Sequence, residues 1–137
     1  MNFSFPFAAA VVVAALMALT GCGSNRPNPL PKIVGTLNYP GFVVTPGCNV
    51  DVRLDDVTVP DAPPTTLAHE TINPRESSPL PFELHYDPKT LVPDHRYVVT
   101  ARINCGAELV LIADPVVPVL TQGNPTTASV TMKRATK

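Results

Sequence analysis

The sequence contains few of the features that mark nucleic-acid binding or catalysis. Its 10 Lys plus Arg are balanced by 11 Asp plus Glu, and the basic cluster from Lys133 to Lys137 lies at the C-terminus. Binding to many phosphates needs a larger basic surface, so we expect no nucleic-acid partner and interpret residues 134–137 as a solvated tail. There is no HExxH, Gly-x-Ser-x-Gly or CxxC motif and no Gly-rich phosphate loop. We therefore expect no catalytic residues, no metal and no cofactor.

Charged side chains are also missing from residues 1–21, which contain the apolar stretch FAAAVVVAALMAL from Phe7 to Leu19. Thirteen residues are too few to span a bilayer comfortably and are typical of the apolar core of a secretory signal peptide. A buried N-terminal helix is the alternative, and Pro6 and the richness in Ala and Val argue against it. We expect residues 1–21 to be a signal peptide.

The signal-like segment ends in Leu19-Thr20-Gly21-Cys22, which resembles the lipobox of bacterial lipoproteins. In that motif the Cys thiol accepts a diacylglycerol, and a further acyl chain such as palmitate is added to its amino group. Two or more chains hold a protein stably on a membrane. We therefore predict lipidation of Cys22; the alternative is a plain cleaved signal with Cys22 free or in a disulfide. Gly23 is not the Asp that marks inner-membrane retention, so we expect the outer membrane, facing the periplasm.

Prolines divide the rest of the chain. Residues 22–32 contain Pro27, Pro29 and Pro31, a spacing that favours an extended tether between the acylated Cys and a domain over 33–133. Within 33–133, prolines recur too often for helices, and apolar residues alternate with polar ones. This pattern predicts an all-β fold, a small antiparallel β-sandwich of about seven strands. The expected strands cover 33–39, 48–59, 66–72, 82–86, 95–104, 108–114 and 127–133.

Two local features refine this prediction. In VDVRLDDVTV the apolar positions change from even (Val50 to Leu54) to odd (Val57 and Val59) at Asp55-Asp56, which predicts a β-bulge or bend there. Residues 103–108 have hairpin-turn chemistry, with Gly106 able to adopt a positive φ.

Several motifs then occur in a characteristic order: Asp61-Ala62-Pro63, PLPFEL over 79–84, Tyr86-Asp87-Pro88, and Pro118 to Gly123. In this order, over roughly 33–133, the chain resembles the YbaY/YscW-like lipoproteins. The resemblance implies an envelope lipoprotein. In its named members it implies a chaperone, or pilotin, for the outer-membrane secretin of a type III secretion system.

Two cysteines remain once Cys22 is assigned to lipid. Cys48 opens one expected strand and Cys105 follows another, so antiparallel pairing of these strands would place the sulfurs side by side. In an exported protein such a pair usually forms a disulfide. We predict the Cys48–Cys105 bond; the alternative is two free or redox-active thiols.

The remaining residues able to take part in chemistry are scattered. His69, His85 and His95 have no metal-ligand spacing, and we expect them to face solvent or to lie at a rim of the domain. Ser77-Ser78 is not part of a Gly-x-Ser-x-Gly motif, so the sequence does not predict a nucleophilic serine there. The apolar stretches at 109–112 and 116–120 are continuous rather than alternating. They predict either a strand covered on both faces or a docking surface for a partner segment.

These observations favour a non-enzymatic outer-membrane lipoprotein, facing the periplasm, that binds another envelope protein such as a secretin. The alternative is a module that binds a small ligand or a polysaccharide, and a hydrolase is a third hypothesis. The shape of the surface separates them. An open apolar strip favours a peptide partner, whereas an enclosed pocket with convergent polar groups favours a small ligand.

Overall fold

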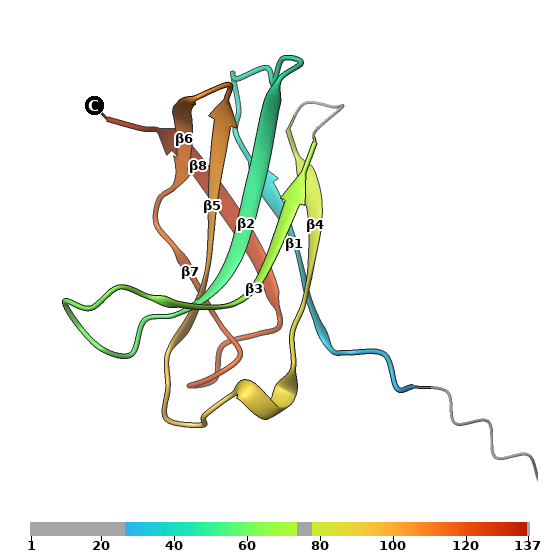
Figure 1. The fold of residues 1–137 in the computed structure, drawn as a ribbon, viewed down its shortest axis with the longest axis vertical. Helices are drawn as coiled ribbons and strands as arrows, with labels where there is room; N and C mark the ends of the chain where they lie inside the picture. The colour runs from blue at the N-terminus through green and yellow to red at the C-terminus, as the bar shows by residue number, and fades with distance from the viewer. Residues whose placement is uncertain (1–26, 74–77, 137) are drawn as a thin grey trace, which may run out of the picture.

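A computed structural model describes residues 27–73 and 78–136 of the chain. In this part, a sheet of short strands wraps around one hydrophobic core into a barrel-like shape (Figure 1). The strands are β1 (Lys32–Asn38), β2 (Cys48–Asp56), β3 (Thr65–Ile72), β4 (Leu80–His85), β5 (Tyr97–Cys105), β6 (Glu108–Ala113), β7 (Val117–Val119) and β8 (Thr127–Arg134). One 3₁₀ turn, η1 (Pro88–Thr90), follows Asp87, whose carboxylate accepts a hydrogen bond from Lys89 N.

The predicted all-β class is confirmed, and all seven expected strands are present. The order around the sheet is β3-β2-β5-β6-β8-β1-β4, and β7 pairs with β5. Strands β1 and β8, the first and last of the domain, pair in parallel, whereas the other pairs are antiparallel. The eighth strand, β7, is three residues long and contains Pro118, so it shows no period-two pattern.

The pairing defines two ends of the molecule. The tether end holds the starts of β1, β5 and β8 together with η1, because Lys32 lies opposite His85 and Val34 opposite Thr127. The distal end holds the loop from β1 to β2, the turn between β5 and β6, and the end of β8. Figure 1 shows the C-terminus at the distal end and residues 27–31 leaving from the opposite one.

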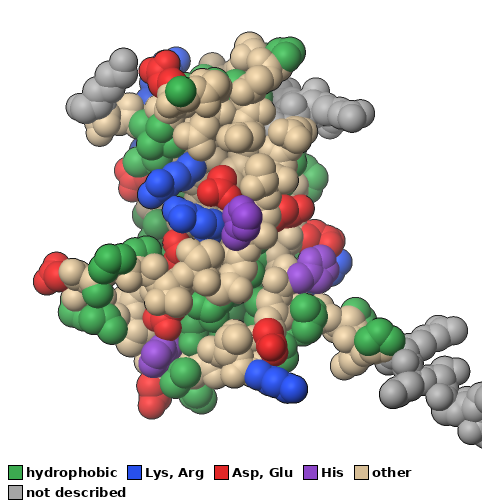
Figure 2. Space-filling view, viewed as in Figure 1, with side chains coloured by type: hydrophobic (Ala, Val, Ile, Leu, Met, Phe, Trp, Pro, Cys, Tyr) green, Lys and Arg blue, Asp and Glu red, His purple; other side chains and the backbone are tan. Residues whose placement is uncertain are grey.

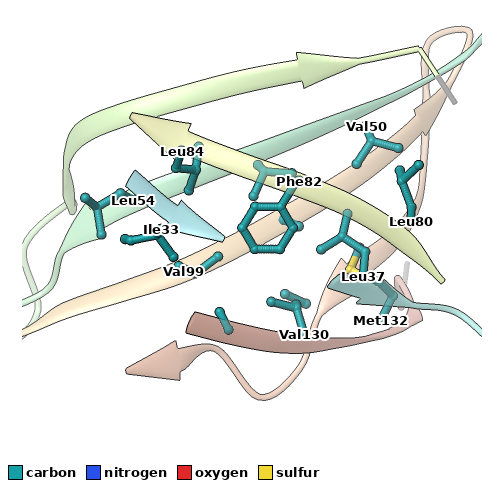
Figure 3. Packing of buried hydrophobic residues seen from close by; sticks show 14 of the residues in the cluster. Ile33, Leu37, Val50, Leu54, Leu80, Phe82, Leu84, Val99, Val130 and Met132 are labelled. Carbon is teal, nitrogen blue, oxygen red and sulfur yellow. The ribbon is translucent and has the colours of Figure 1, made fainter. Parts of the chain in front are cut away.

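Alternate residues of the strands fill the core, as period two requires. Val50, Val52 and Leu54 are fully buried, and Phe82 and Leu84 are nearly so. Phe82 lies in the middle of the cluster (Figure 3). Burying one such side chain contributes roughly 1.5 to 3 kcal/mol to stability.

Gly35 allows this packing on β1. A Cβ at Gly35 would lie 2.6 Å from Cζ of Phe82 and would also clash with the backbone oxygen of Ala128 on β8. Neither neighbour can move far, because one is a core ring and the other is backbone. The absence of a side chain at Gly35 thus lets β4, β1 and β8 pack closely at the centre of the barrel.

The predicted irregularity near Asp55 is present, but the additional residue lies on the partner strand. The register of β2 against β3 shifts between Leu54 and Asp55, and Leu67 of β3 has no opposite residue. The expectation that Val59 points inward is wrong: β2 ends at Asp56 and Val59 is 66% exposed. The Asp56 carboxylate accepts hydrogen bonds from Thr58 N and Oγ1, which turn the chain away from the sheet. The turn after β5 forms as predicted, with Gly106 at φ 63°.

Candidate docking site

Several residues singled out in the sequence lie outside the described part of the chain. They are the predicted signal peptide, 1–21, the predicted lipidation site Cys22 with Gly23, and Ser77. Ser78 is described, and its Oγ accepts a hydrogen bond from Tyr39 N at 2.8 Å. Ser78 therefore holds the chain at the end of β1.

Cys48 and Cys105 lie directly opposite each other on β2 and β5 and are joined in a disulfide. Their Cα atoms are 3.9 Å apart. The bond is at the distal end, where Gly106 N also donates to Gly47 O at 3.1 Å. The loop from β1 to β2 is thereby tied to the turn between β5 and β6.

His69 and His85 line the same surface groove, whereas His95 lies apart from them. His69 is on β3 and His85 on β4, both exposed, whereas His95 is half-buried at the tether end. Among residues 27–73 and 78–136, no three or more His, Cys, Asp or Glu side chains lie close enough together to hold a metal ion. His69 Nε2 is 3.3 Å from Asp51 Oδ1, on a face of β2 and β3 where charged and histidine side chains gather (Figure 2).

His95 is part of a polar network that the sequence pattern did not reveal, since its partner is 39 residues away. His95 Nδ1 lies 2.6 Å from Asp56 Oδ2, and Thr121 Oγ1 donates to His95 O. Burial raises the pKa of Asp56, but hydrogen bonds from Thr58 and His95 and the attraction of His95 outweigh this, so the pKa lies below its ordinary 3.8. The network joins the loop before β5 to the end of β2.

The apolar stretch 109–120 is divided between the two faces of the sheet. Leu111, Ala113 and Val119 point into the core, whereas Leu109 and Val116 are 38% and 44% exposed. Val110 is half-buried, and Ala135 N donates to its carbonyl oxygen at 3.0 Å. The outward apolar residues therefore contribute to surface grooves at both ends of the molecule.

The first groove is the seam between β3 and β4, the two strands at the ends of the sheet order. It has a volume of about 580 Å³ and is lined by His69, Glu70, Pro81, Phe82, Glu83 and His85. Amide groups of an antiparallel strand point alternately to its two neighbours. Because Tyr86 N donates to Pro31 O on the β1 side, the odd-numbered residues of β4 direct their backbone groups towards the seam.

The seam is protected against the addition of another strand. Pro81 has no N–H group, and the N–H of Glu83 donates to Oε2 of Glu70 at 3.2 Å. Both devices, a proline on the edge and a carboxylate from the neighbouring strand, are ways in which proteins keep sheet edges from pairing. The hydrogen bond from Lys32 holds the pKa of Glu83 below its ordinary 4.5, so this rim stays ionised.

The second groove, of about 260 Å³, lies at the tether end between Val57, Val98, Val116 and Pro118. Some of its polar groups bond to one another or to the adjoining loops. Asn124 Nδ2 donates to Thr121 O at 2.8 Å, and Arg96 N donates to Thr58 Oγ1 at 2.8 Å.

The third groove, here called the distal groove, consists of two adjoining hollows that share Phe42 and Arg134. The larger, of about 500 Å³, is also lined by Leu109 and Val110. The smaller, of about 220 Å³, also lies against Tyr39, Leu111 and Met132. Beside it, Val43 is 72% exposed.

The fold and these open grooves define a small all-β domain with room for a partner on its surface. The chain belongs to the family of type III secretion system lipoprotein chaperones (YscW), whose family model matches residues 28–132. This confirms the resemblance inferred from the sequence motifs. No helix among the described residues is long and apolar enough to cross a membrane.

Two relatives extend the comparison. The uncharacterized lipoprotein YbaY of Escherichia coli (strain K12) is 34% identical over 95 residues, which is 68% of this chain. This chain spans 50% of the length of that relative. A solved structure of an alternative pilotin from the type II secretion system of Vibrio cholerae matches with a TM-score of 0.72 and 29% identity. The match covers 79% of this chain and 99% of that one.

Proposed function

We propose that this protein is a lipid-anchored chaperone of the outer membrane, facing the periplasm, that assists the assembly of a secretin and catalyses no reaction. The observation that carries the proposal is the match to a secretion-system pilotin over nearly that protein's whole length, at 29% identity. Membership of a lipoprotein-chaperone family supports the same function.

The order of segments suits this task. Removal of residues 1–21 would leave Cys22 as the acylated first residue, and two or more acyl chains hold a protein on a membrane. Residues 22–32 then form a spacer, which at about 3.1 Å per residue holds the domain roughly 30 Å from the lipid. The domain, 33–133, remains free to reach a partner in the periplasm.

The surface favours a protein partner over the small-ligand alternative. The grooves are open to solvent, and two of them are lined mainly by apolar side chains next to exposed Val43 or Val116. An enclosed cavity with convergent polar groups is the usual form of a small-molecule site. Open apolar grooves suit segments of other proteins.

The test is the formation of secretin multimers in the protein's own host. Deleting the gene should reduce detergent-resistant multimers in the outer membrane, and restoring the wild-type gene should return them. A Cys22→Ser variant should stay in the periplasm and fail to restore outer-membrane multimers, because it lacks the anchor. Equal multimer levels with and without the wild-type protein would contradict the proposed function.

A histidine variant provides the matched control. Replacing both His69 and His85 by Gln should leave multimer formation unchanged, because both side chains are exposed and neither belongs to the apolar grooves at the two ends. Loss of multimers in this variant, with the domain folded and anchored, would instead point to chemistry at the seam.

A further inference from the structure

We propose that the distal groove recognises a partner segment in which an apolar side chain lies beside a carboxylate. The inference rests on the proposed function and adds the chemistry by which the partner is recognised. The two hollows of this groove meet at Phe42 and Arg134, which places an apolar and a cationic side chain at the same point.

The apolar part of the site consists of side chains that are only partly covered by the described residues. Phe42 and Val110 are half-buried and Leu109 is 38% exposed, and all three line the larger hollow. Val43, the residue after Phe42, is 72% exposed. Apolar anchors in a pocket usually contribute most of the affinity of an interface.

The polar part of the site is an unpartnered phenol. Tyr39 lines the smaller hollow, is 1% exposed, and its Oη has no hydrogen-bond partner among the described residues. Native proteins rarely leave a buried hydroxyl unsatisfied. Burial raises the pKa of Tyr39, so the phenol is neutral and keeps an O–H donor that no described residue uses.

The charges around the groove favour a carboxylate as that acceptor. Arg134 lines both hollows, Lys133 lines the smaller and Glu108 the larger. Lys133 is paired with Asp114 at 3.3 Å. No ion pair within the described ranges involves the exposed Arg134 guanidinium, whose planar donors suit a carboxylate.

The rims of the groove are already held in place. The Cys48–Cys105 disulfide and the Gly106 N to Gly47 O bond fix the loop carrying Phe42 to the turn preceding Leu109. On the other side, Ala135 N donates to Val110 O. A site whose walls are fixed before binding loses less conformational freedom when a segment docks, which raises affinity.

The test uses the full chain with Cys22→Ser, secreted to the periplasm, labelled with ¹⁵N and titrated with three synthetic peptides. The first contains Leu, Phe and Glu; the second has each Glu replaced by Lys; the third has Leu and Phe replaced by Ser. The first peptide should bind best and should shift NMR signals of Phe42, Leu109 and Arg134. Equal binding of the Lys peptide, or shifts confined to the seam or the tether end, would overturn the proposal.

Variants separate recognition from folding. Arg134→Glu should weaken binding of the Glu peptide by about tenfold or more, since charge reversal replaces attraction with repulsion. Tyr39→Phe should weaken it severalfold while keeping or raising the thermal midpoint, because it removes an unsatisfied buried hydroxyl. A Tyr39→Phe protein that is less stable but binds equally well would assign the phenol a structural role instead.

The secretin assay distinguishes the two proposals. If wild type supports multimers and a folded Arg134→Glu protein does so equally well, the distal groove is not the recognition site although the function stands. If wild type has no effect on the secretin, the proposed function fails, and the peptide titration alone then decides the chemistry of the groove.

Discussion

The same strands end in two different ways at the two ends of the barrel. At the tether end, polar side chains bond to one another: His95 to Asp56 at 2.6 Å, Asp56 to Thr58, and Thr121 to the carbonyl oxygen of His95. At the distal end, a disulfide ties two loops, Phe42 is half-buried, Val43 is exposed, and the Tyr39 phenol has no described partner.

This difference suits a small domain that keeps its loops rigid while leaving side chains at one end available. In a polar network the side chains that hold the loops are hydrogen-bonded to one another. Few of their donors and acceptors are then free to bond with a partner. One covalent bond between Cys48 and Cys105 holds two loops and leaves the surrounding side chains available. We therefore expect substitutions at the tether end to alter stability and those at the distal end to alter binding.

The largest effect on stability is expected from the disulfide. It is an exception to the division above, because it lies at the distal end and yet stabilises the fold. Replacing Cys48 and Cys105 together by Ala should lower the free energy of unfolding by roughly 4 kcal/mol, because the bond closes a span of 57 residues. Denaturant titration measures this. Hydrogen exchange should increase most in residues 39–47 and 106–110. Reduced wild type should match the variant, and a loss confined to the tether end would contradict the assignment.

The second-largest loss of stability is expected from replacing Asp56 at the tether end. Asp56→Asn should lower the free energy of unfolding by about 1 to 2 kcal/mol at neutral pH, since charged hydrogen bonds to Thr58 and His95 are weakened. The pKa of Asp56 is lower in the folded protein than its ordinary 3.8. Its contribution is therefore complete above about pH 3.8 and is lost as the pH falls through the folded value.

Unfolding measured from pH 7 downward tests this sign. The difference between wild type and Asp56→Asn should shrink below about pH 3.8 and disappear in stronger acid. A difference that stays constant across that range would show that the carboxylate charge is not what stabilises the tether end.

A smaller change in the free energy of unfolding is expected from a substitution in the seam, the groove between β3 and β4. Glu70→Ala removes the acceptor of the Glu83 N–H, but water can replace it, so the cost should stay below about 1 kcal/mol. The variant should self-associate more, because the edge of β4 gains an unoccupied donor. Sedimentation velocity measures this. Glu70→Gln keeps an oxygen acceptor and should remain like wild type; equal self-association of the two variants would contradict the role of Glu70.

The smallest change in stability is expected at Val43. Because Val43 is 72% exposed, Val43→Ser should alter the free energy of unfolding by less than about 0.5 kcal/mol. It should nevertheless weaken binding of the Leu, Phe and Glu peptide. Val59→Ser is the matched control, because Val59 is 66% exposed at the tether end. Equal loss of binding in both variants would contradict the expectation that the peptide binds at the distal end and not at the tether end.

Much of the fold could be predicted because the strands alternate cleanly. The inward positions of Phe82, Leu84 and Tyr86 follow from period two, and Cys48 and Cys105 could be paired because each stands at a strand terminus. Periodicity does not reveal which strands are neighbours. The parallel pairing of β1 with β8 therefore could not be read from the sequence.

The features of the candidate site were harder to predict. The His95–Asp56 pair joins residues 39 positions apart, and the unsatisfied Tyr39 phenol is defined only by what surrounds it in space. The apolar alternation predicts that Val59 points inward, yet hydrogen bonds from Thr58 to Asp56 end the strand before it. Local side-chain bonds of this kind compete with the sheet and are invisible to hydrophobic patterns.

The parallel pairing of β1 with β8 has a mechanical consequence. β1 begins at the tether end and lies between β8 and β4 along its length. A force that pulls the tether away from the distal end would run along β1 and strain its hydrogen bonds to β4 and β8 at once. Such shear must break many bonds together, whereas peeling a strand from its end breaks them one after another. We therefore expect the domain to stay folded under a load directed along β1.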